Sequence, residues 1–335
     1  MPLNIAVIGF GYWGPNIVRN FESAEGAKVV TICDMDEKQR QRAARMYPNI
    51  KVTDALSEAT SATEVDAVAI VTPVFTHHDL AKQALNNGKH VFVEKPFTAT
   101  SEEAKELINL AEQKGLVIMV DHTFLFTGAV RKIKELVDQG VLGDLYYYDS
   151  TRVNLGLFQH DVNVVWDLAP HDFSIMNYLV NEKPVGLSAT GAGHFGRGLE
   201  DVAYVSVYFE SNMIAHFNVN WLSPVKLRST LIGGANKMLL WNDLENDEKI
   251  KVYDKGVDVR SKEGLYNLLV SYRSGDMFSP RTEMTEALKL EAEYFITCID
   301  KNEKPFNDGA AGLEVVDMLK ASDQSIKQKG AFVEL

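Results

Sequence analysis

The sequence predicts an α/β protein with two parts, a doubly wound parallel sheet followed by an α+β domain built on a large, open, mostly antiparallel sheet. Three observations predict this fold. Apolar runs alternate with helical patterns over roughly the first 120 residues. A glycine-rich turn follows the first apolar run. After about residue 145, strand-like runs follow one another with little helix between them. We therefore expect domains at residues 1–122 and 123–335.

The N-terminal domain opens with an apolar run at residues 3–8, which is typical of a buried strand. A helix follows the glycine turn, and Pro15 suits its first turn because the missing N–H has no helical partner there. Gly88 and Gly115 end two later helices. Further strands are expected at 29–33, 50–52, 65–71, 89–93 and 116–120, with helices at 37–46, 54–56, 77–87 and 101–114.

The C-terminal domain is expected to hold a sheet of roughly six strands. Residues 216–221 alternate between polar and apolar side chains, which predicts a strand with two chemically different faces. The expected strands are 186–193, 202–210, 214–221, 227–232 and 237–241, and the expected helices are 170–179, 282–301 and 310–329. We expect the last helix to pack back on the N-terminal domain. The apolar stripe of Tyr294, Phe295 and Ile299 is expected to be core.

Composition excludes several classes of partner. The net charge of −12 argues against nucleic acid or an anionic membrane as the main partner. No apolar run approaches the ~20 residues that span a bilayer. The chain enters a strand directly, so we expect no cleavable signal and a cytoplasmic location. Cys33 and Cys298 lie in apolar patterns and are expected to be buried thiols, and no Cys/His cluster has metal-ligand spacing, so no metal is expected.

The glycine turn carries a dinucleotide fingerprint, with an acid twenty residues beyond it. Gly9 permits the tight turn, Gly11 lets the backbone approach a pyrophosphate, and Gly14 lets the helix pack close to the strand. Asp34 can accept hydrogen bonds from ribose hydroxyls, which favours NAD over NADP. The alternative stays open, because Lys38 and Arg40 could receive a 2′-phosphate. The predicted NAD-binding residues of this region are Gly9, Phe10, Gly11, Tyr12, Trp13, Gly14 and Asp34.

Three further motifs follow in order, and together with the glycine turn they resemble the Gfo/Idh/MocA oxidoreductases over nearly the whole chain. They are Thr72-Pro73 with His77, Glu94-Lys95-Pro96, and Asp167 with His171. The resemblance implies a Rossmann domain joined to an open-sheet substrate domain. The stretches 11–16 and 163–172 are similar to relatives that act on nucleotide-linked sugars, often at C3 of a UDP-N-acetylhexosamine or its uronate. Ala169-Pro170 departs from that family, in which glycine is frequent before the histidine.

Lys95 can also be interpreted without the family. It lies just past a parallel strand, where such sheets bind ligands, and partial burial would suit it to exchange a proton with a substrate hydroxyl. Pro96 restricts Lys95 and can form a cis bond that fixes the direction of the lysine. The alternative from the local sequence alone is an exposed lysine at the start of a loop.

Asp167 and His171 lie four residues apart and therefore share one face of a helical turn. An imidazole titrates near neutral pH, so His171 could take the proton of an alcohol as hydride leaves the carbon. The alternative is that Asp167 caps the helix and His171 packs in its first turn.

The remaining site residues rest on the resemblance. It implies NAD contacts by Thr72, Pro73, His77, Glu94, Lys95 and His122. It implies substrate contacts by Lys95, Arg152, Asn154, Asn163, Asp167 and His171. His77 could instead be a structural cap, and Arg152 could form a surface salt bridge.

These observations predict an NAD-dependent dehydrogenase or reductase acting on a CH–OH group of a sugar, with Lys95, Asp167 and His171 as catalytic residues. Free polyols or inositol are an alternative substrate class, a glycosidase with bound NAD is a second alternative, and a non-catalytic NAD sensor is a third. An open sheet with one apolar face needs a cover, so we expect a homodimer or homotetramer formed through the C-terminal sheet.

Overall fold

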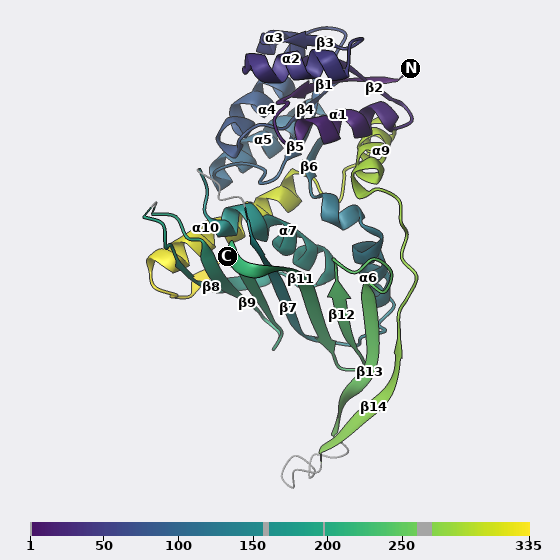
Figure 1. The fold of residues 1–335 in the computed structure, drawn as a ribbon, viewed down its shortest axis with the longest axis vertical. Helices are drawn as coiled ribbons and strands as arrows, with labels where there is room; N and C mark the ends of the chain where they lie inside the picture. The colour runs from purple at the N-terminus through teal and green to yellow at the C-terminus, as the bar shows by residue number, and fades with distance from the viewer. Residues whose placement is uncertain (1, 157–160, 197, 260–269) are drawn as a thin grey trace. The chain divides into compact units, whose positions relative to one another are not determined.

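The chain forms two compact units in the computed structural model, which describes residues 2–156, 161–196, 198–259 and 270–335 (Figure 1). Unit 1 comprises residues 1–126 and 285–317, and unit 2 comprises residues 127–284 and 318–335. Residues 285–317 thus group with the N-terminal residues although they come late in the chain. The domain boundary between 122 and 123 stays a prediction.

Unit 1 contains a six-stranded parallel sheet in the order β3-β2-β1-β4-β5-β6. The strands are β1 (Leu3–Ile8), β2 (Ala27–Cys33), β3 (Lys51–Thr53), β4 (Ala67–Ile70), β5 (His90–Glu94) and β6 (Ile118–Asp121). Because every strand runs the same way, all their carboxyl ends lie along one edge of the sheet. The predicted doubly wound sheet is confirmed, and its carboxyl edge is where such sheets bind ligands.

Helices cover both faces of this sheet. They are α1 (Gly14–Ser23), α2 (Glu37–Met46), α3 (Leu56–Thr60), α4 (His77–Asn86), α5 (Ser101–Lys114) and α9 (Ala287–Lys301), with 3₁₀ turns η1 (Val74–Thr76) and η2 (Thr123–Phe126). Ile5 and Val7 point into one core and Ala6 and Ile8 into the other, as expected of a strand buried on both sides. Phe295 of α9 lies in the first core, with Tyr294 and Ile299 packed against it, as predicted. Both cysteines are buried and free, also as predicted.

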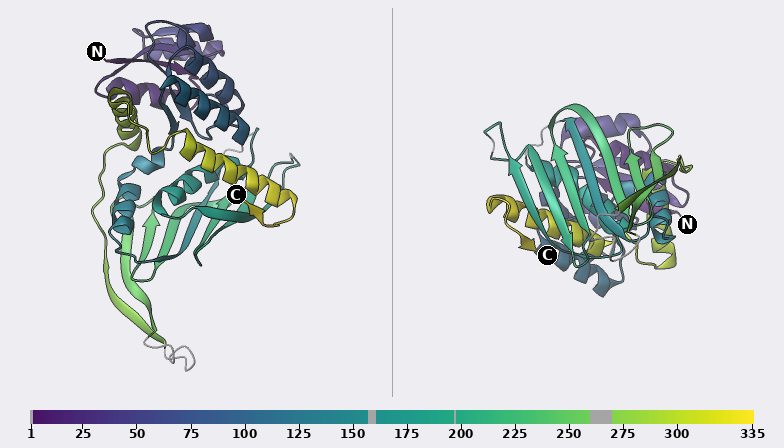
Figure 2. Two further views of the ribbon diagram at one scale, coloured as in Figure 1. Left: turned by 180° about the vertical axis from the view of Figure 1, so that it is seen from behind. Right: turned by 90° about the horizontal axis from the view of Figure 1, so that it is seen from below.

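Unit 2 is built on a nine-stranded sheet in the order β14-β13-β12-β11-β7-β10-β9-β8-β15. Only β7 and β10 pair in parallel; the other described pairs are antiparallel, as predicted. Figure 2 shows these strands side by side, with β13 and β14 forming a long hairpin at one end. The strands are β7 (Leu145–Leu155), β8 (Pro184–Ala192), β9 (Val202–Phe209), β10 (Ile214–Asn220), β11 (Leu222–Gly234), β12 (Met238–Asn242), β13 (Ile250–Val259), β14 (Val270–Phe278) and β15 (Val333–Glu334).

The expectation of roughly six strands was too low. Strands β7, β13, β14 and β15 and helix α6 (Gly128–Asp138) were not predicted. In β7 and β13, charged residues such as Asp149 and Lys251 interrupt the apolar pattern. The alternation predicted for residues 216–221 is confirmed in β10, where Ala215, Phe217 and Val219 are buried.

Helix α7 (Val164–Leu179) begins earlier than predicted and packs on β7, β9 and β10. We expected its start at Pro170, which instead lies inside the helix. The real start is set by Asn163, whose side chain accepts hydrogen bonds from the N–H groups of Val165 and Trp166, both at 3.1 Å. Helix α10 (Gly309–Lys327) is divided between the two units after residue 317. Among the described residues, no helix is long and apolar enough to cross a membrane.

Candidate functional site

The glycine turn after β1 has the geometry that its sequence predicts. Gly9 has a φ of +99°, which side chains rarely adopt, and a Cβ there would lie 2.4 Å from the Val71 carbonyl oxygen. A Cβ on Gly14 would lie 2.4 Å from the Gly9 carbonyl oxygen, so only glycine allows the start of α1 to approach the turn. Gly11 differs, because a Cβ there would meet no protein atom within 4 Å. None of the described residues requires glycine at that position, which fits a backbone approached by a ligand.

The N-terminus of α1 lies directly behind this turn. Trp13 is the N-cap residue, its side chain makes no capping hydrogen bond, and the first turn has no acidic residue. The positive end of the helix dipole therefore favours an anion such as a pyrophosphate. Pro15 occupies the first turn, as predicted. Tyr12 is 88 % exposed at the tip of the turn.

Asp34 lies just past β2 and is held by backbone donors. Its Oδ2 accepts a 2.6 Å hydrogen bond from the Phe10 N–H, and its Oδ1 accepts a 2.8 Å hydrogen bond from the Asp36 N–H. The carboxylate is thus fixed beside the glycine turn, in position to accept ribose hydroxyls. A cavity of about 480 Å³ adjoins it. Its lining includes Gly9, Gly11, Asp34, Leu56, Thr72 and Leu80.

Arg40 is engaged by protein groups near this cavity. Its Nη1 donates to the carbonyl oxygens of Asp34 at 3.0 Å and Met35 at 2.9 Å, and its Nη2 lies 3.4 Å from Oδ2 of Asp54. A 2′-phosphate would have to compete with these partners.

The turn after β4 is tied to the loop after β5 by His77. This buried imidazole lies between carbonyl oxygens, with Nε2 2.8 Å from Thr72 O and Nδ1 3.0 Å from Pro96 O. Burial lowers the pKa of His77 despite these acceptors. Its side chain therefore links two loops at the carboxyl edge. A direct contact of His77 with NAD stays a prediction, as it does for Thr72 and Pro73, both of which line the cavity.

Glu94-Lys95-Pro96 ends β5 at the same edge. The Lys95–Pro96 peptide bond is cis, as the sequence suggested. Lys95 is half-buried, its N–H donates to the Glu94 carboxylate, and its charge acts on both His77 and His122. Lys95 thus lies at the carboxyl edge of the sheet, where its proposed role requires it.

The end of β6 carries a buried polar cluster that the sequence only partly revealed. Burial, with the nearby charge of Lys95, lowers the pKa of His122 to about 3, so the imidazole is neutral. Neither ring nitrogen of His122 has a hydrogen-bond partner among the described residues. Glu291 and Asn307 complete the cluster and were missed. The signal was visible in Glu291, an acid on the same buried stripe of α9 as Leu288 and Phe295.

In unit 2, α7 presents Asp167 and His171 on successive turns, and both side chains are half-buried. Oδ2 of Asp167 accepts a 3.0 Å hydrogen bond from the Trp221 indole. The capping residue of α7 is Asn163, so the alternative that Asp167 caps this helix is wrong. The Asn163 amide nitrogen donates to Glu200 at 2.9 Å and Asp323 at 3.0 Å, which makes this residue part of the protein's own bonding.

Arg152 of β7 forms a buried ion pair with Asp172, the residue after His171. Its Nε lies 2.7 Å from Oδ2 and its Nη2 3.0 Å from Oδ1 of Asp172. Arg152 therefore does form a salt bridge, but the alternative that placed this bridge on the surface is wrong, because Arg152 is only 5 % exposed. Asn154 is half-buried in the same strand. Substrate contacts by Arg152, Asn154 and Asn163 stay predictions.

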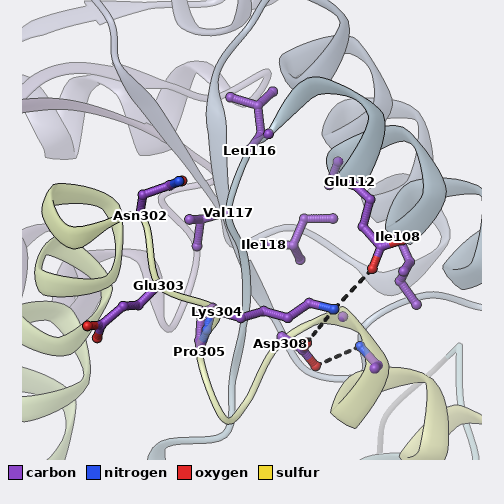
Figure 3. Close-up of a pocket in the computed structure, with 14 residues that line it drawn as sticks. Ile108, Glu112, Leu116, Val117, Ile118, Asn302, Glu303, Lys304, Pro305 and Asp308 are labelled. Carbon is purple, nitrogen blue, oxygen red and sulfur yellow. Dashed lines mark hydrogen bonds and ion pairs between the residues drawn. The ribbon is translucent and has the colours of Figure 1, made fainter.

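A second cavity, of about 180 Å³, lies in unit 1 at the opposite edge of the sheet, beside the start of β6 (Figure 3). Lys304 extends between Glu112 of α5, at 3.0 Å, and Asp308, at 3.6 Å. Parallel sheets bind their ligands at the carboxyl edge, so this cavity is separate from the dinucleotide site. Among the described residues, no group of three His, Cys, Asp or Glu side chains could hold a metal ion.

The fold and the site define a class of protein: an oxidoreductase whose Rossmann unit binds a dinucleotide, joined in one chain to an open-sheet unit. The chain belongs to the Gfo/Idh/MocA family. The profile described as "Oxidoreductase family, NAD-binding Rossmann fold" matches residues 3–122. The profile of the "GFO/IDH/MocA C-terminal domain" matches residues 130–239. The cofactor is NAD, and the turn, the Gly11 backbone and Asp34 fit it.

Relatives of known activity align over most of the chain. UDP-N-acetylglucosamine 3-dehydrogenase from Acidithiobacillus ferrooxidans is 26 % identical over 318 residues, which is 94 % of both chains. A solved structure of that enzyme superposes with a TM-score of 0.80 at 23 % identity, over 98 % of this chain and 99 % of the other. The scyllo-inositol 2-dehydrogenase (NAD(+)) of Bacillus subtilis is 26 % identical over 326 residues, covering 92 % of this chain and 91 % of its own.

An uncharacterized oxidoreductase of Streptococcus pneumoniae is 27 % identical over 226 residues. That alignment spans 62 % of this chain and only 60 % of the relative's length.

Proposed function

We propose that this chain is an NAD-dependent dehydrogenase that moves a hydride between nicotinamide and a secondary alcohol or ketone of a sugar. The observation that carries the proposal is the placement of Lys95 after β5, on the same sheet edge as the glycine turn and Asp34. A cation at that edge can act on a substrate hydroxyl next to the dinucleotide. The alignment over more than nine-tenths of the chain with two dehydrogenases of ring alcohols supports it.

The proposed chemistry gives each residue one task. When bound, NAD supplies the hydride acceptor or donor. His171 removes the hydroxyl proton during oxidation, and Lys95 donates a hydrogen bond to the same oxygen and stabilises its developing charge. Asp167, fixed by Trp221, positions the sugar and the histidine. Run in reverse, these residues reduce a ketone.

We further propose that the substrate is a nucleotide-linked sugar. The support is the similarity of residues 11–16 and 163–172 to relatives of that kind, together with the UDP-N-acetylglucosamine 3-dehydrogenase relative. The inositol dehydrogenase relative has the same percentage of sequence identity to this chain, 26 %, and it favours a free polyol as the second candidate substrate.

An absorbance assay of NADH formation decides between these substrate classes. Purified protein is offered NAD with a panel of UDP-sugars and, in parallel, a panel of free inositols, glucose and polyols. We expect saturable NADH formation with a UDP-N-acetylhexosamine or its uronate. Saturating turnover on free inositol or glucose without response to UDP-sugars would overturn the nucleotide-sugar proposal and leave the dehydrogenase proposal intact.

Variants test the proposed roles. Lys95→Met and His171→Asn are each expected, at saturating NAD, to lose about 10²- to 10⁴-fold in kcat, as removal of an acid–base group does. Lys82→Met is the matched control, because Lys82 is a half-exposed lysine of α4 paired with Glu106. Normal turnover in both Lys95→Met and His171→Asn would contradict the proposed chemistry. Turnover without net NADH release would point to the glycosidase alternative instead, and a non-catalytic NAD sensor would bind NADH without turning over any of the panels.

We also propose a homodimer or homotetramer formed through the sheet of unit 2. Large apolar side chains on its strands are exposed, among them Tyr204, Tyr208, Ile214, Leu227 and Leu231. Light scattering of the wild type is expected to give two or four chains, and Leu231→Lys is expected to shift it toward one. A monomeric wild type would overturn this. The cytoplasmic location stays a prediction.

A further inference from the structure

Two carboxyl side chains meet in the interior of unit 1 at the end of β6. Asp121 is the last residue of that strand and is 2 % exposed. Glu291 comes from α9 and is fully buried. Two charged carboxylates side by side away from water would repel each other and lose their hydration, so one of the two is expected to be neutral. The hydrogen-bond partners of each side chain indicate which one carries the charge.

The Asp121 side chain accepts three hydrogen bonds. Its Oδ1 accepts the Thr123 N–H at 3.2 Å and the Thr123 hydroxyl. Its Oδ2 accepts a 3.2 Å hydrogen bond from the Trp13 indole of the glycine turn. Such a set of donors stabilises a carboxylate, so Asp121 is the charged member of the pair.

The two carboxyl oxygens of Glu291 differ in their hydrogen-bond partners. Its Oε1 accepts hydrogen bonds from the His122 N–H at 3.1 Å and the Asn307 amide at 2.9 Å. Its Oε2 receives none from any donor in the described part of the chain. The side chains that it meets are Asp121, which is also an acceptor, and Thr123, whose hydroxyl already gives its proton to Oδ1 of Asp121. Two acceptors can bond in a buried site only with a proton between them.

The surroundings of Glu291 favour its protonated, neutral form. Burial, with the charge of Asp121 and that of Glu94, raises the pKa of Glu291 well above its ordinary value. A neutral Glu291 can then donate to Asp121 while it accepts from His122 and Asn307.

We propose that Glu291 is a positioning residue of the NAD site, which as a neutral carboxylic acid donates a hydrogen bond to Asp121 and so fixes the acceptor that holds Trp13. Through this chain of bonds, α9 sets the position of the glycine turn after β1. The inference rests on the NAD-binding role of that turn and is independent of which sugar, if any, the chain oxidises.

Three variants test it by NADH fluorescence titration, which needs no substrate. Glu291→Gln can donate to Asp121 through its amide, so its NADH Kd is expected within about threefold of wild type. Glu291→Leu loses these bonds and is expected to weaken NADH binding tenfold or more, about 1.4 kcal/mol. Glu293→Gln is the control, because Glu293 is a half-exposed residue of α9 paired with Lys289. It is expected to bind NADH as the wild type does.

Infrared spectroscopy tests the proton itself, even if Glu291→Leu fails to fold. The wild type and Glu293→Gln are expected to show the carbonyl band of a protonated carboxyl group at neutral pH, and Glu291→Gln is expected to lose that band. An unchanged band in Glu291→Gln would overturn the proposal, as would a Kd in Glu291→Gln raised as far as in Glu291→Leu.

Discussion

The Trp13 indole donates a 3.2 Å hydrogen bond to Oδ2 of Asp121, which joins the glycine turn after β1 to the end of β6. In the sheet, β4 and β5 lie between these two strands. The bond therefore spans the part of the carboxyl edge that carries Thr72 and Lys95. A displacement of the end of β6 would be passed directly to the turn that receives the pyrophosphate.

Alanine at the two loop glycines should separate folding from cofactor binding. Gly14→Ala forces a Cβ to within 2.4 Å of a carbonyl oxygen and is expected to reduce the free energy of unfolding by about 2–4 kcal/mol. In Gly11→Ala the new Cβ has no described neighbour within 4 Å, so the free energy of unfolding is expected to stay within about 0.5 kcal/mol of wild type. Its NADH Kd should nevertheless rise about tenfold or more, since the methyl group occupies space needed by the phosphates.

Urea unfolding and NADH fluorescence measure the two effects. Wild-type NADH affinity in Gly11→Ala would show that the pyrophosphate does not approach this turn.

Removing the Asp34 carboxylate should change the choice of cofactor. In Asp34→Ser the ribose loses a charged acceptor, worth about 1.5–3 kcal/mol, so NADH binding should weaken roughly ten- to hundredfold. NADPH should weaken less, because the repulsion of its 2′-phosphate is removed as well. The ratio of the two dissociation constants, from fluorescence titrations, is the readout. Any general loss of stability would affect both cofactors alike, so an unchanged ratio would refute the assignment of Asp34.

The dinucleotide half of the site could be predicted because its chemistry is local. A tight turn, a close helix and an acid after the next strand require particular residues at short spacing, and Gly9, Gly14 and Asp34 meet those requirements in the structure. The same reasoning failed at the start of α7. Pro170 is a strong local signal for a first turn, but the Asn163 cap comes earlier and determines where the helix begins.

Partners distant in sequence were beyond such reasoning. Glu291 bonds to the N–H of His122 across 169 residues, and no local pattern pairs them. Arg152 was recognised as a charge that needs a partner, yet nothing nearby indicates Asp172 rather than a ligand phosphate. Strand β13 escaped prediction because its lysines and aspartates break up the apolar alternation.

Breaking the Arg152–Asp172 pair from one side should be costly. In Arg152→Met, Asp172 remains buried without its cation, and the free energy of unfolding should fall by about 3–5 kcal/mol. Replacing both partners, as in Arg152→Met with Asp172→Leu, should cost much less than the sum of the single changes, because no charge is left buried. Urea unfolding of the four proteins gives the coupling energy. Single variants costing under about 1 kcal/mol would mean that the pair is hydrated in solution.

The buried His122 predicts a specific loss of stability in acid. Burial lowers the pKa of His122 to about 3 in the folded chain, whereas the unfolded imidazole titrates near its ordinary value of 6.5. Between these two values the unfolded state binds a proton that the folded state does not. The contribution of His122 is therefore complete above pH 6.5 and is lost as the pH falls toward 3, at up to about 1.4 kcal/mol per pH unit.

His122→Phe keeps a ring of similar size but cannot titrate, so it removes this dependence. Its stability relative to wild type should therefore rise at each step from pH 7 to pH 5. The free energy of unfolding of the variant minus that of wild type becomes more positive, measured by urea unfolding in buffers of equal ionic strength. The neutral phenyl ring also leaves no buried nitrogen without a partner, so the variant should fold at neutral pH. A constant difference across that pH range would show that the imidazole takes up its proton in the folded protein as readily as in the unfolded one.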